Sequence, residues 1–468
     1  MQRLSPLDAM FLHQDHPETP RQVASLAIIT PGERPLDYDR LIQVINERID
    51  LVPRYRQVPR RVPGGLGMPV WVDDEHFDLS LHVRRSALPR PGGRDALHEL
   101  VGRLVARRLD HERPLWELYL IEGLQGGELA LLFKSHQALV DGSHTVDLAQ
   151  VLLEETQRDR TIPHEEWIPR SAPGAIELVA GSVRSQLSRP AELLWSGEYQ
   201  WSRLTSKLPV LSPDSATHSP LVSALSRHRR FTTVSAPLSD FRRVRDEHGG
   251  TVNDVILAAI AGGLRGWMLT RAEPVTAKTG FRAMVPMSVT RDGPAGEGLP
   301  TSLGPRVRGL MLTLPVGESN AVVRLHQVSY ALKGHREMGS AVAANKMASL
   351  PGFATSTFHA VGARVAADES HRPYHLVITN VPGPQDPVYM AGQQLKEIYP
   401  ALPLTGHRTI SVGVTSYDGH VYFGVVTDRE SVPDADVLGQ CILEALEELT
   451  ETIGPRRTRA PRGRKRPT

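Results

Sequence analysis

The stretch Phe133-Lys134-Ser135-His136-Gln137-Ala138-Leu139-Val140-Asp141-Gly142 runs from an apolar strand into a polar turn. Residues 128–133 predict a buried strand, and apolar residues at one-face spacing over 146–152 predict a helix after the turn. His136, Asp141 and Gly142 are therefore presented together where a strand ends. Asp-Gly is also an ordinary turn dipeptide, and a single histidine beside a strand is often structural. The spacing of these residues alone does not decide between a functional site and an ordinary turn with a structural histidine.

Length and composition indicate an ordinary globular protein. A chain of 468 residues exceeds the size of one core, so about two domains are expected. The single cysteine, Cys441, excludes an intramolecular disulfide framework and a multi-thiolate metal site, and favours a cytoplasmic location. The N-terminus has no signal-peptide pattern, and no run of about 18 apolar residues predicts a transmembrane helix.

The net charge of +2 hides a basic C-terminal tail. Seven Lys and Arg residues lie after Glu451 with no acid among them, so the rest of the chain carries about 2 − 7 = −5. Such a Pro/Gly/Arg segment is typical of a solvated, disordered end, and binding to anionic lipid or nucleic acid is the alternative. Basic and aromatic residues are not interleaved elsewhere, so nucleic-acid binding is not expected.

Both halves of the chain combine helices with hairpins. Apolar periodicity predicts a helix in each of the segments 36–50, 97–109, 239–247, 251–267 and 437–449. Strand signals lie at 79–83 and in two hairpins, 118–122 with 128–135, and 408–416 with 420–427 through Asp418-Gly419. We predict two α/β sandwiches facing each other: residues 1–160, a crossover linker with a helical segment at 161–230, residues 231–454, and a basic disordered tail at 455–468.

Five stretches of the chain form a pattern together: Leu4-Ser5-Pro6-Leu7-Asp8-Ala9-Met10-Phe11, Pro114-Leu115-Trp116-Glu117, His136 to Gly142, Val252-Asn253-Asp254-Val255-Ile256-Leu257-Ala258 and Asn380-Val381-Pro382-Gly383-Pro384. Together they resemble the bacterial wax ester synthase/diacylglycerol acyltransferase family over nearly the whole chain. The resemblance implies two α/β halves like chloramphenicol acetyltransferase and condensation domains, with a tunnel between them. It also implies acyl transfer from the co-substrate acyl-CoA to diacylglycerol or a long-chain alcohol, without a bound cofactor or metal. A peripheral position at the inner membrane face or on lipid inclusions is a further expectation.

The family's active-site pattern is HHxxxDG, in which the second histidine is the general base. Here His136 matches the first histidine and Gln137 the second, so a glutamine stands at the base position. A second departure lies at Ser302-Leu303-Gly304-Pro305, where the family usually has an asparagine after the glycine.

Acyl transfer to an alcohol needs a group that removes the hydroxyl proton. A neutral imidazole with a pKa near 6.5 suits this task, and a positioned base contributes roughly 10²- to 10⁴-fold. The carboxamide of Gln137 cannot take the proton, although its NH₂ can donate to a developing oxyanion. Adjacent strand residues point to opposite faces, so His136 is expected to face away and to be structural. His144 lies beyond the turn, at a helix start.

The remaining candidate residues have roles implied by the resemblance. Asp141 orients the loop, often through an arginine, and Gly142 permits a tight turn and close approach of the backbone. Asn253 and Asp254 either shape a substrate site or cap a helix, for which Thr251 is also a candidate cap. Among the candidate substrate-binding residues, Asn380, Pro382 and Gly383 form a rigid loop at a strand end.

The leading hypothesis is an acyl-CoA-dependent O-acyltransferase with weakened activity. One alternative is an inactive homologue that binds lipid or acyl-CoA and acts as a regulator. Another is an acyltransferase that acts on a different hydroxyl or on an amine, whose own basicity relaxes the need for a protein base.

Overall fold

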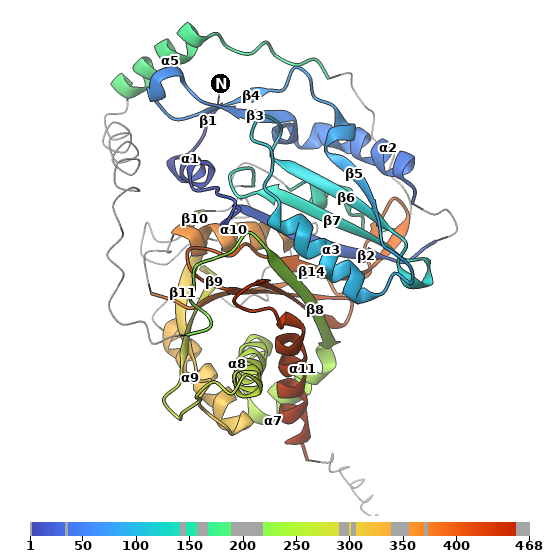
Figure 1. The fold of residues 1–468 in the computed structure, drawn as a ribbon, viewed down its shortest axis with the longest axis vertical. Helices are drawn as coiled ribbons and strands as arrows, with labels where there is room; N and C mark the ends of the chain where they lie inside the picture. Colours follow the sequence, from blue (N-terminus) through green and yellow to red (C-terminus); the bar gives the residue numbers. More distant parts are fainter. Residues whose placement is uncertain are drawn as a thin grey trace, which may run out of the picture.

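The computed structural model describes residues 2–32, 36–140, 147–156, 167–188, 219–289, 299–300, 306–337, 355–368 and 373–454. These residues are organised around two large β-sheets, one in each half of the molecule. Figure 1 shows the N-terminal half above the C-terminal half, with helices on both sheets.

The N-terminal half is built on a six-stranded sheet in which β7 lies between β2 and β6. β2 and β6 are apolar along nearly their whole length and almost fully buried, as expected for strands covered on both faces. β6 and β7 pair antiparallel, which confirms the first predicted hairpin. The strand order is β13 (Tyr389–Met390), β14 (Gln393–Ala401), β2 (Gln22–Ile29), β7 (Leu129–His136), β6 (Trp116–Glu122) and β5 (Val83–Ala87), and a small separate sheet contains β1 (Gln2–Arg3), β4 (Val70–Asp73) and β3 (Gln57–Arg60).

The predicted strand at 79–83 is wrong in its first part. Leu79–Leu81 form the 3₁₀ turn η4, and β5 begins only at Val83. The Asp78 carboxylate accepts the Ser80 amide N–H at 2.9 Å, and this local hydrogen bond competes with strand pairing.

The helices of the N-terminal half start at side-chain caps or after turns. Ser5 and Asp8 form a capping box at the start of α1, and Asp37 caps α2. The helices are α1 (Pro6–His13), α2 (Tyr38–Arg48), α3 (Arg94–Ala106), α4 (Leu148–Leu152) and α5 (Ala175–Ser188), and the further 3₁₀ turns are η1 (Ile49–Leu51), η2 (Pro53–Arg56), η3 (Pro63–Gly65) and η5 (Gln125–Gly127).

The C-terminal half is built on a seven-stranded sheet that is mostly antiparallel. β12 is the exception, because it runs parallel to both of its neighbours, β9 and β15. Asp418 and Gly419 have φ values of 44° and 75° and join β15 to β16, which confirms the second predicted hairpin. The strand order is β10 (Leu299–Pro300), β11 (Arg306–Leu314), β9 (Phe281–Val289), β12 (Leu376–Pro382), β15 (Ile410–Tyr417), β16 (His420–Asp428) and β8 (Arg229–Pro237).

Helix α8 is the central helix of the C-terminal core. Thr251 forms its N-terminal capping box with Asp254, and Gly262 and Gly263 allow close packing against α11. Figure 1 shows α8 beside α11 and α9, below the sheet. α8 is long and apolar enough to cross a membrane by composition, but it is mostly buried, as the core helix of a folded domain is. The helices of this half are α7 (Leu238–His248), α8 (Val252–Thr270), α9 (Ala321–Glu337), α10 (Thr355–Asp368) and α11 (Ala435–Glu451).

β14 and α10 are segments of the C-terminal half that reach the N-terminal half. β14 pairs with β2 and so extends the N-terminal sheet. α10 contacts β12 on one side and β2 and α4 on the other, and Figure 1 shows it between the two sheets. A boundary drawn along the sequence therefore does not separate the two sheets fully, and the boundaries given above remain a prediction.

Candidate active site

His136 is the last residue of β7, and its side chain is fully buried. The backbone N–H of Ala138 donates to His136 Nδ1 at 3.0 Å, so the ring proton lies on Nε2, 3.9 Å from Asp15 Oδ2. Burial lowers the pKa of His136 to about 3, which keeps the ring neutral. Its one lone pair already accepts a backbone N–H, so these contacts support the structural role.

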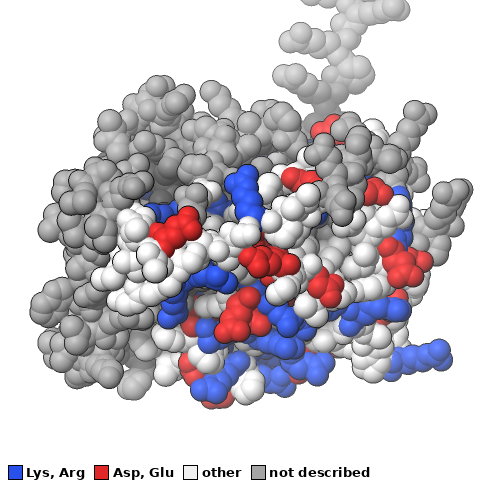
Figure 2. Space-filling view, turned by 90° about the horizontal axis from the view of Figure 1, so that it is seen from above, with Lys and Arg blue, Asp and Glu red and all other residues white. Residues whose placement is uncertain are grey.

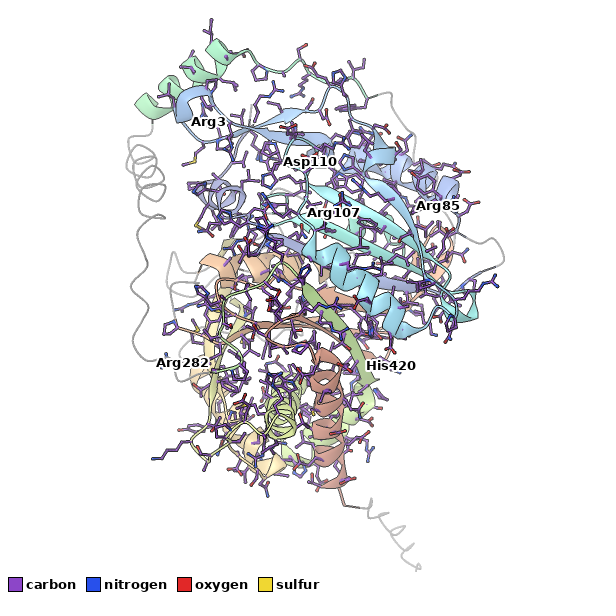
Figure 3. The ribbon with its side chains drawn as sticks, in the orientation of Figure 1. Arg3, Arg85, Arg107, Asp110, Arg282 and His420 are labelled. Carbon is purple, nitrogen blue, oxygen red and sulfur yellow. The ribbon has the colours of Figure 1, made fainter. Side chains whose placement is uncertain are left out.

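Asp15 is the centre of a polar cluster behind this histidine. Its carboxylate accepts hydrogen bonds from His111 Nε2 at 2.7 Å, Arg108 Nε at 3.0 Å and the Arg21 backbone N–H at 2.8 Å. Burial alone raises the pKa of Asp15, but the His111 hydrogen bond and the nearby positive charges outweigh burial and hold the pKa well below its ordinary value. The segment after α3 that carries His111 lies within the N-terminal half, where Figure 3 labels Arg107 and Asp110.

Asp15, His111 and His136 offer three possible metal-ligand atoms within 4.8 Å of one another. The surrounding charges do not suit a divalent cation, because Arg108 already contacts the same carboxylate oxygen as His111. One carboxylate next to a guanidinium is better matched as an internal ion pair. The cluster therefore fits a structural role that fixes the end of β7.

Gln137 stands at the position of the expected base. The backbone N–H of Gln137 donates to the backbone carbonyl of Arg21 at 2.8 Å, and the backbone carbonyl of Gln137 accepts a hydrogen bond from Arg364 Nη1. The side chain is fully buried, yet neither its Oε1 nor its Nε2 meets a hydrogen-bonding partner among the described residues. Leaving such a group unpaired costs about 1–3 kcal/mol, so Gln137 is a candidate contact for a ligand.

A cavity of about 20 Å³ lies between the halves beside β7. It has room for about one water molecule and must widen before an acyl chain can enter. Phe133, Lys134 and Ser135 of β7 line it, whereas His136 and Gln137 do not. The full lining is Val23, Ala24, Ser25, Tyr55, Trp116, Glu117, Phe133, Lys134, Ser135, Asp147, Leu148, His359 and Pro400.

Most polar groups on the N-terminal wall of the cavity are paired with each other. The Tyr55 hydroxyl donates to Asp147 Oδ1 at 2.8 Å, and Lys134 Nζ lies 3.2 Å from Glu117 Oε2. The Trp116 indole N–H donates to the Tyr55 carbonyl at 2.8 Å. Trp116 and Glu117 of the predicted motif Pro114 to Glu117 therefore line the cavity with polar groups that already have partners.

His359 is a cavity residue that the sequence analysis did not identify. It comes from α10, is 2% exposed, and its Nδ1 lies 2.6 Å from Thr379 Oγ1. Its Nε2 has no hydrogen-bonding partner among the described residues. The only sequence signal is one histidine within a helix of small and apolar residues, which is more often a packed core residue.

Arg364, one and a half turns further along α10, connects the two halves. Its guanidinium lies 2.6 Å from the Asp8 carboxylate of α1 and also donates to the Gln137 carbonyl. Both side chains of this ion pair are almost completely buried. The first family-like stretch, which contains Asp8, thus helps to hold the end of β7.

Asn253 and Asn380 are brought together, but Asp254 has a different role. Asn380 Nδ2 donates to Asn253 Oδ1 at 2.8 Å, which joins the start of α8 to β12. Asp254 is fully buried, completes the capping box and accepts the Ser329 hydroxyl at 2.5 Å, so it stabilises α8. Alternation along β12 puts Asn380 on the α8 face and Thr379 on the α10 face. None of these side chains lines the cavity.

Pro382 ends β12 and Gly383 begins the loop after it. Pro382 lies opposite Ser416 in β15, and the Gly383 N–H donates to the Ser416 carbonyl at 2.9 Å. These contacts fix the strand end, but the expected loop begins later than predicted, because Asn380 and Pro382 pair within β12 and only Gly383 lies beyond it. The candidates Asp141, Gly142 and His144, the stretch 302–305 and the basic tail lie outside the described residues.

A family model for the wax ester synthase/diacylglycerol acyltransferase catalytic domain matches residues 4–256, more than half of the chain. This chain belongs to that family. The model of the family's C-terminal domain matches residues 303–450, so both halves of a wax ester synthase/diacylglycerol acyltransferase are represented.

Two relatives from Mycobacterium tuberculosis align with this chain over most of their own length. The probable diacylglycerol O-acyltransferase tgs1 of Mycobacterium tuberculosis is 32% identical over 473 aligned residues, which cover 99% of each chain. The probable diacylglycerol O-acyltransferase tgs3 of the same species is 40% identical over 257 residues, covering 52% of this chain and 95% of tgs3.

Solved structures agree with the fold. The wax ester synthase/diacylglycerol acyltransferase from Marinobacter aquaeolei VT8 superposes with a TM-score of 0.67 at 25% identity, covering 97% of this chain and all of that one. The first condensation domain of the calcium-dependent antibiotic synthetase gives a TM-score of 0.55 at 15% identity, covering 97% and 98% of the two chains, which shows a shared fold. The predicted family, α/β fold class and acyltransferase activity are confirmed.

Proposed function

We propose that this acyltransferase moves a fatty acyl group from acyl-CoA to the hydroxyl of diacylglycerol or of a long-chain alcohol. The observation that carries the proposal is the position of the family motif beside the cavity between the halves, in a chain that aligns end to end with tgs1. The cavity wall includes Val23, Phe133 and Leu148, apolar side chains that suit a lipid substrate.

Position 137 contributes binding or charge stabilisation in this mechanism. The buried, unpaired amide of Gln137 can donate to the oxyanion that forms when the thioester carbonyl is attacked. It cannot accept the hydroxyl proton. We therefore expect turnover below that of a family member with both histidines.

The substrates need a wider passage than the closed cavity provides. We propose that the halves separate along α10 to form a tunnel, with the acyl chain and the acceptor entering the same space. α10 contacts strands of both sheets and carries the cavity residue His359, so a small shift of this helix changes the cavity directly.

We further propose that the protein works in the cytoplasm, in peripheral contact with a lipid surface that supplies diacylglycerol. On the face shown in Figure 2, acidic and basic side chains are interspersed over the described residues. The tail after Gly454 is therefore the segment to test. If removing it leaves sedimentation with anionic vesicles unchanged, the tail has no part in docking.

The direct test of function is acylation by the purified full chain. Oleoyl-CoA is supplied with dioleoylglycerol or hexadecanol in mixed micelles, and triacylglycerol or wax ester is measured together with released CoA. Equal amounts of ester and CoA are expected, and a reaction without acceptor controls for thioester hydrolysis.

Two other outcomes favour the alternatives. Saturable binding of oleoyl-CoA with no consumption across the acceptors would favour a lipid-binding regulator. Acylation of a sugar, peptide or amine acceptor, with none of diacylglycerol or alcohol, would favour a different substrate class.

A further inference from the structure

We propose that His359 on α10 is the general base that accepts the proton of the acceptor hydroxyl, replacing the histidine missing at position 137. The inference rests on the acyl transfer proposed above. It assigns the proton-transfer step to a side chain from the C-terminal half, whereas the family motif lies in the N-terminal half.

The position of His359 meets the first requirement of a base. His359 lines the cavity from α10, and Ser25 of β2 and Ser135 of β7 line it from the N-terminal sheet. A hydroxyl group held in this space lies next to the ring. Gln137 is tied to the same helix, because its carbonyl accepts from Arg364 of α10.

The hydrogen bonds of His359 leave one nitrogen available. Nδ1 lies 2.6 Å from the Thr379 hydroxyl, and Nε2 has no partner among the described residues. When Nδ1–H donates to Thr379 Oγ1, the free lone pair is on Nε2. Thr379 is then the positioning residue that selects the reactive tautomer.

The resting ring is neutral. Burial lowers the pKa of His359 to about 3, so the imidazole keeps its lone pair at neutral pH but is a weaker base than a free imidazole. Because burial causes this shift, widening of the cavity for the substrates should raise the pKa back toward its ordinary value. The other titratable groups of the cavity wall are paired with each other. The Tyr55 hydroxyl donates to the Asp147 carboxylate, and Lys134 forms an ion pair with Glu117. Arg364 of the same helix is paired with Asp8.

Two other histidines of the N-terminal half are less suitable. The lone pair of His136 accepts the Ala138 N–H. His82 lies behind the indole of Trp116, with ring centroids 4.7 Å apart, and its Nδ1 bonds to the Trp116 carbonyl. Neither ring lines the cavity.

The proposed step is balanced in atoms and charge. As the acceptor oxygen forms its bond to the thioester carbonyl carbon, its proton moves to His359 Nε2. The tetrahedral intermediate then breaks its carbon–sulfur bond, and the departing CoA thiolate takes the same proton from Nε2. The ester and CoA are released, and His359 is neutral again.

The experiment compares wild type with His359→Asn, Gln137→His and the double variant. Asparagine places an amide nitrogen near the position of Nδ1, so it retains a bond to Thr379 and preserves the fold while removing the base. The matched control is His98→Gln, since His98 Nε2 bonds to the Thr233 hydroxyl at 2.8 Å away from the cavity. Thermal unfolding of each variant is measured alongside kcat and KM for oleoyl-CoA and dioleoylglycerol.

We expect His359→Asn to lose roughly 10²- to 10⁴-fold in kcat with little change in KM. Gln137→His in the same chain should restore a large part of the loss, because it returns the family's base. His98→Gln should retain wild-type kcat.

A kcat for His359→Asn within about threefold of wild type would overturn the inference. A loss that Gln137→His does not repair also counts against it, since that result indicates a structural role. An inactive wild type, by contrast, would contradict the proposed function itself, so the two failures are distinguishable.

Discussion

His359 Nδ1 and Thr379 Oγ1 lie 2.6 Å apart, joining α10 to β12 where the two halves of the molecule meet. This bond fixes the orientation of a buried imidazole. Its consequence is that the other ring nitrogen, Nε2, is left without a hydrogen-bonding partner among the described residues.

Replacing Thr379 by valine should slow the reaction without unfolding the protein. The isosteric change removes one hydrogen bond worth about 1 kcal/mol, which corresponds to roughly a fivefold fall in kcat. Steady-state kinetics test this, with Thr233→Val, at the equivalent contact of His98, as the control. An unchanged kcat in Thr379→Val would argue that the hydroxyl does not select the tautomer.

Acid should destabilise the protein through two deeply buried histidines, His136 and His359. Burial lowers the pKa of His136 and of His359 to about 3, whereas an unfolded histidine has a pKa near 6.5. Between these values the unfolded chain binds more protons, so stability is lost as the pH falls from about 6.5 to about 3. The slope approaches ~1.4 kcal/mol per pH unit for each such histidine.

Urea unfolding at a series of pH values measures this dependence. The slope between pH 6.5 and 4.5 should be reduced in His359→Asn relative to wild type. His420 is exposed at the start of β16, where Figure 3 labels it, so His420→Asn should leave the slope unchanged. Identical slopes in all three proteins would show that His359 is not buried in its neutral form.

Removing Arg364 should destabilise the junction between the halves. Arg364→Ala leaves the buried Asp8 carboxylate unpaired and breaks the bond to the Gln137 carbonyl, at a cost of about 3–5 kcal/mol. Denaturant unfolding measures the loss. The exposed pair Arg245 and Asp246 is the control, because Arg245→Ala should cost about 1 kcal/mol or less.

Helix α8 should be sensitive to small additions of volume. A Cβ at Gly263 would lie 2.5 Å from Ile442 Cγ1 and 2.8 Å from its backbone, so Gly263→Ala should destabilise by about 1–3 kcal/mol. Gly334 in α9 has open space around it, and alanine there should stabilise by about 0.5–1 kcal/mol. Equal effects at the two positions would contradict the close packing of α8 and α11.

Local signals in the sequence predicted much of the fold. Asp418-Gly419 gave the correct hairpin because both positions require positive φ, and Thr251 was a correct cap because its hydroxyl bonds to the third helical N–H. Contacts between segments that are distant in the sequence could not be predicted in this way. The pairing of β14 with β2 joins segments far apart in the chain, and no local pattern encodes it.

The candidate site was only partly predictable for the same reason. The motif identified the end of β7 and the glutamine at position 137. His359 and Arg364 reach that place from α10, more than 200 positions later, through contacts that depend on the packing of two halves. A histidine among alanine, valine and glycine has no sequence feature that distinguishes a base from a core residue.

The most direct test of the central claim is the formation of triacylglycerol from oleoyl-CoA and dioleoylglycerol by the full chain, with and without His359. We predict ester and CoA in equal amounts from wild type, and a loss of roughly 10²-fold or more in His359→Asn. Undiminished ester formation by a folded His359→Asn protein would contradict the account.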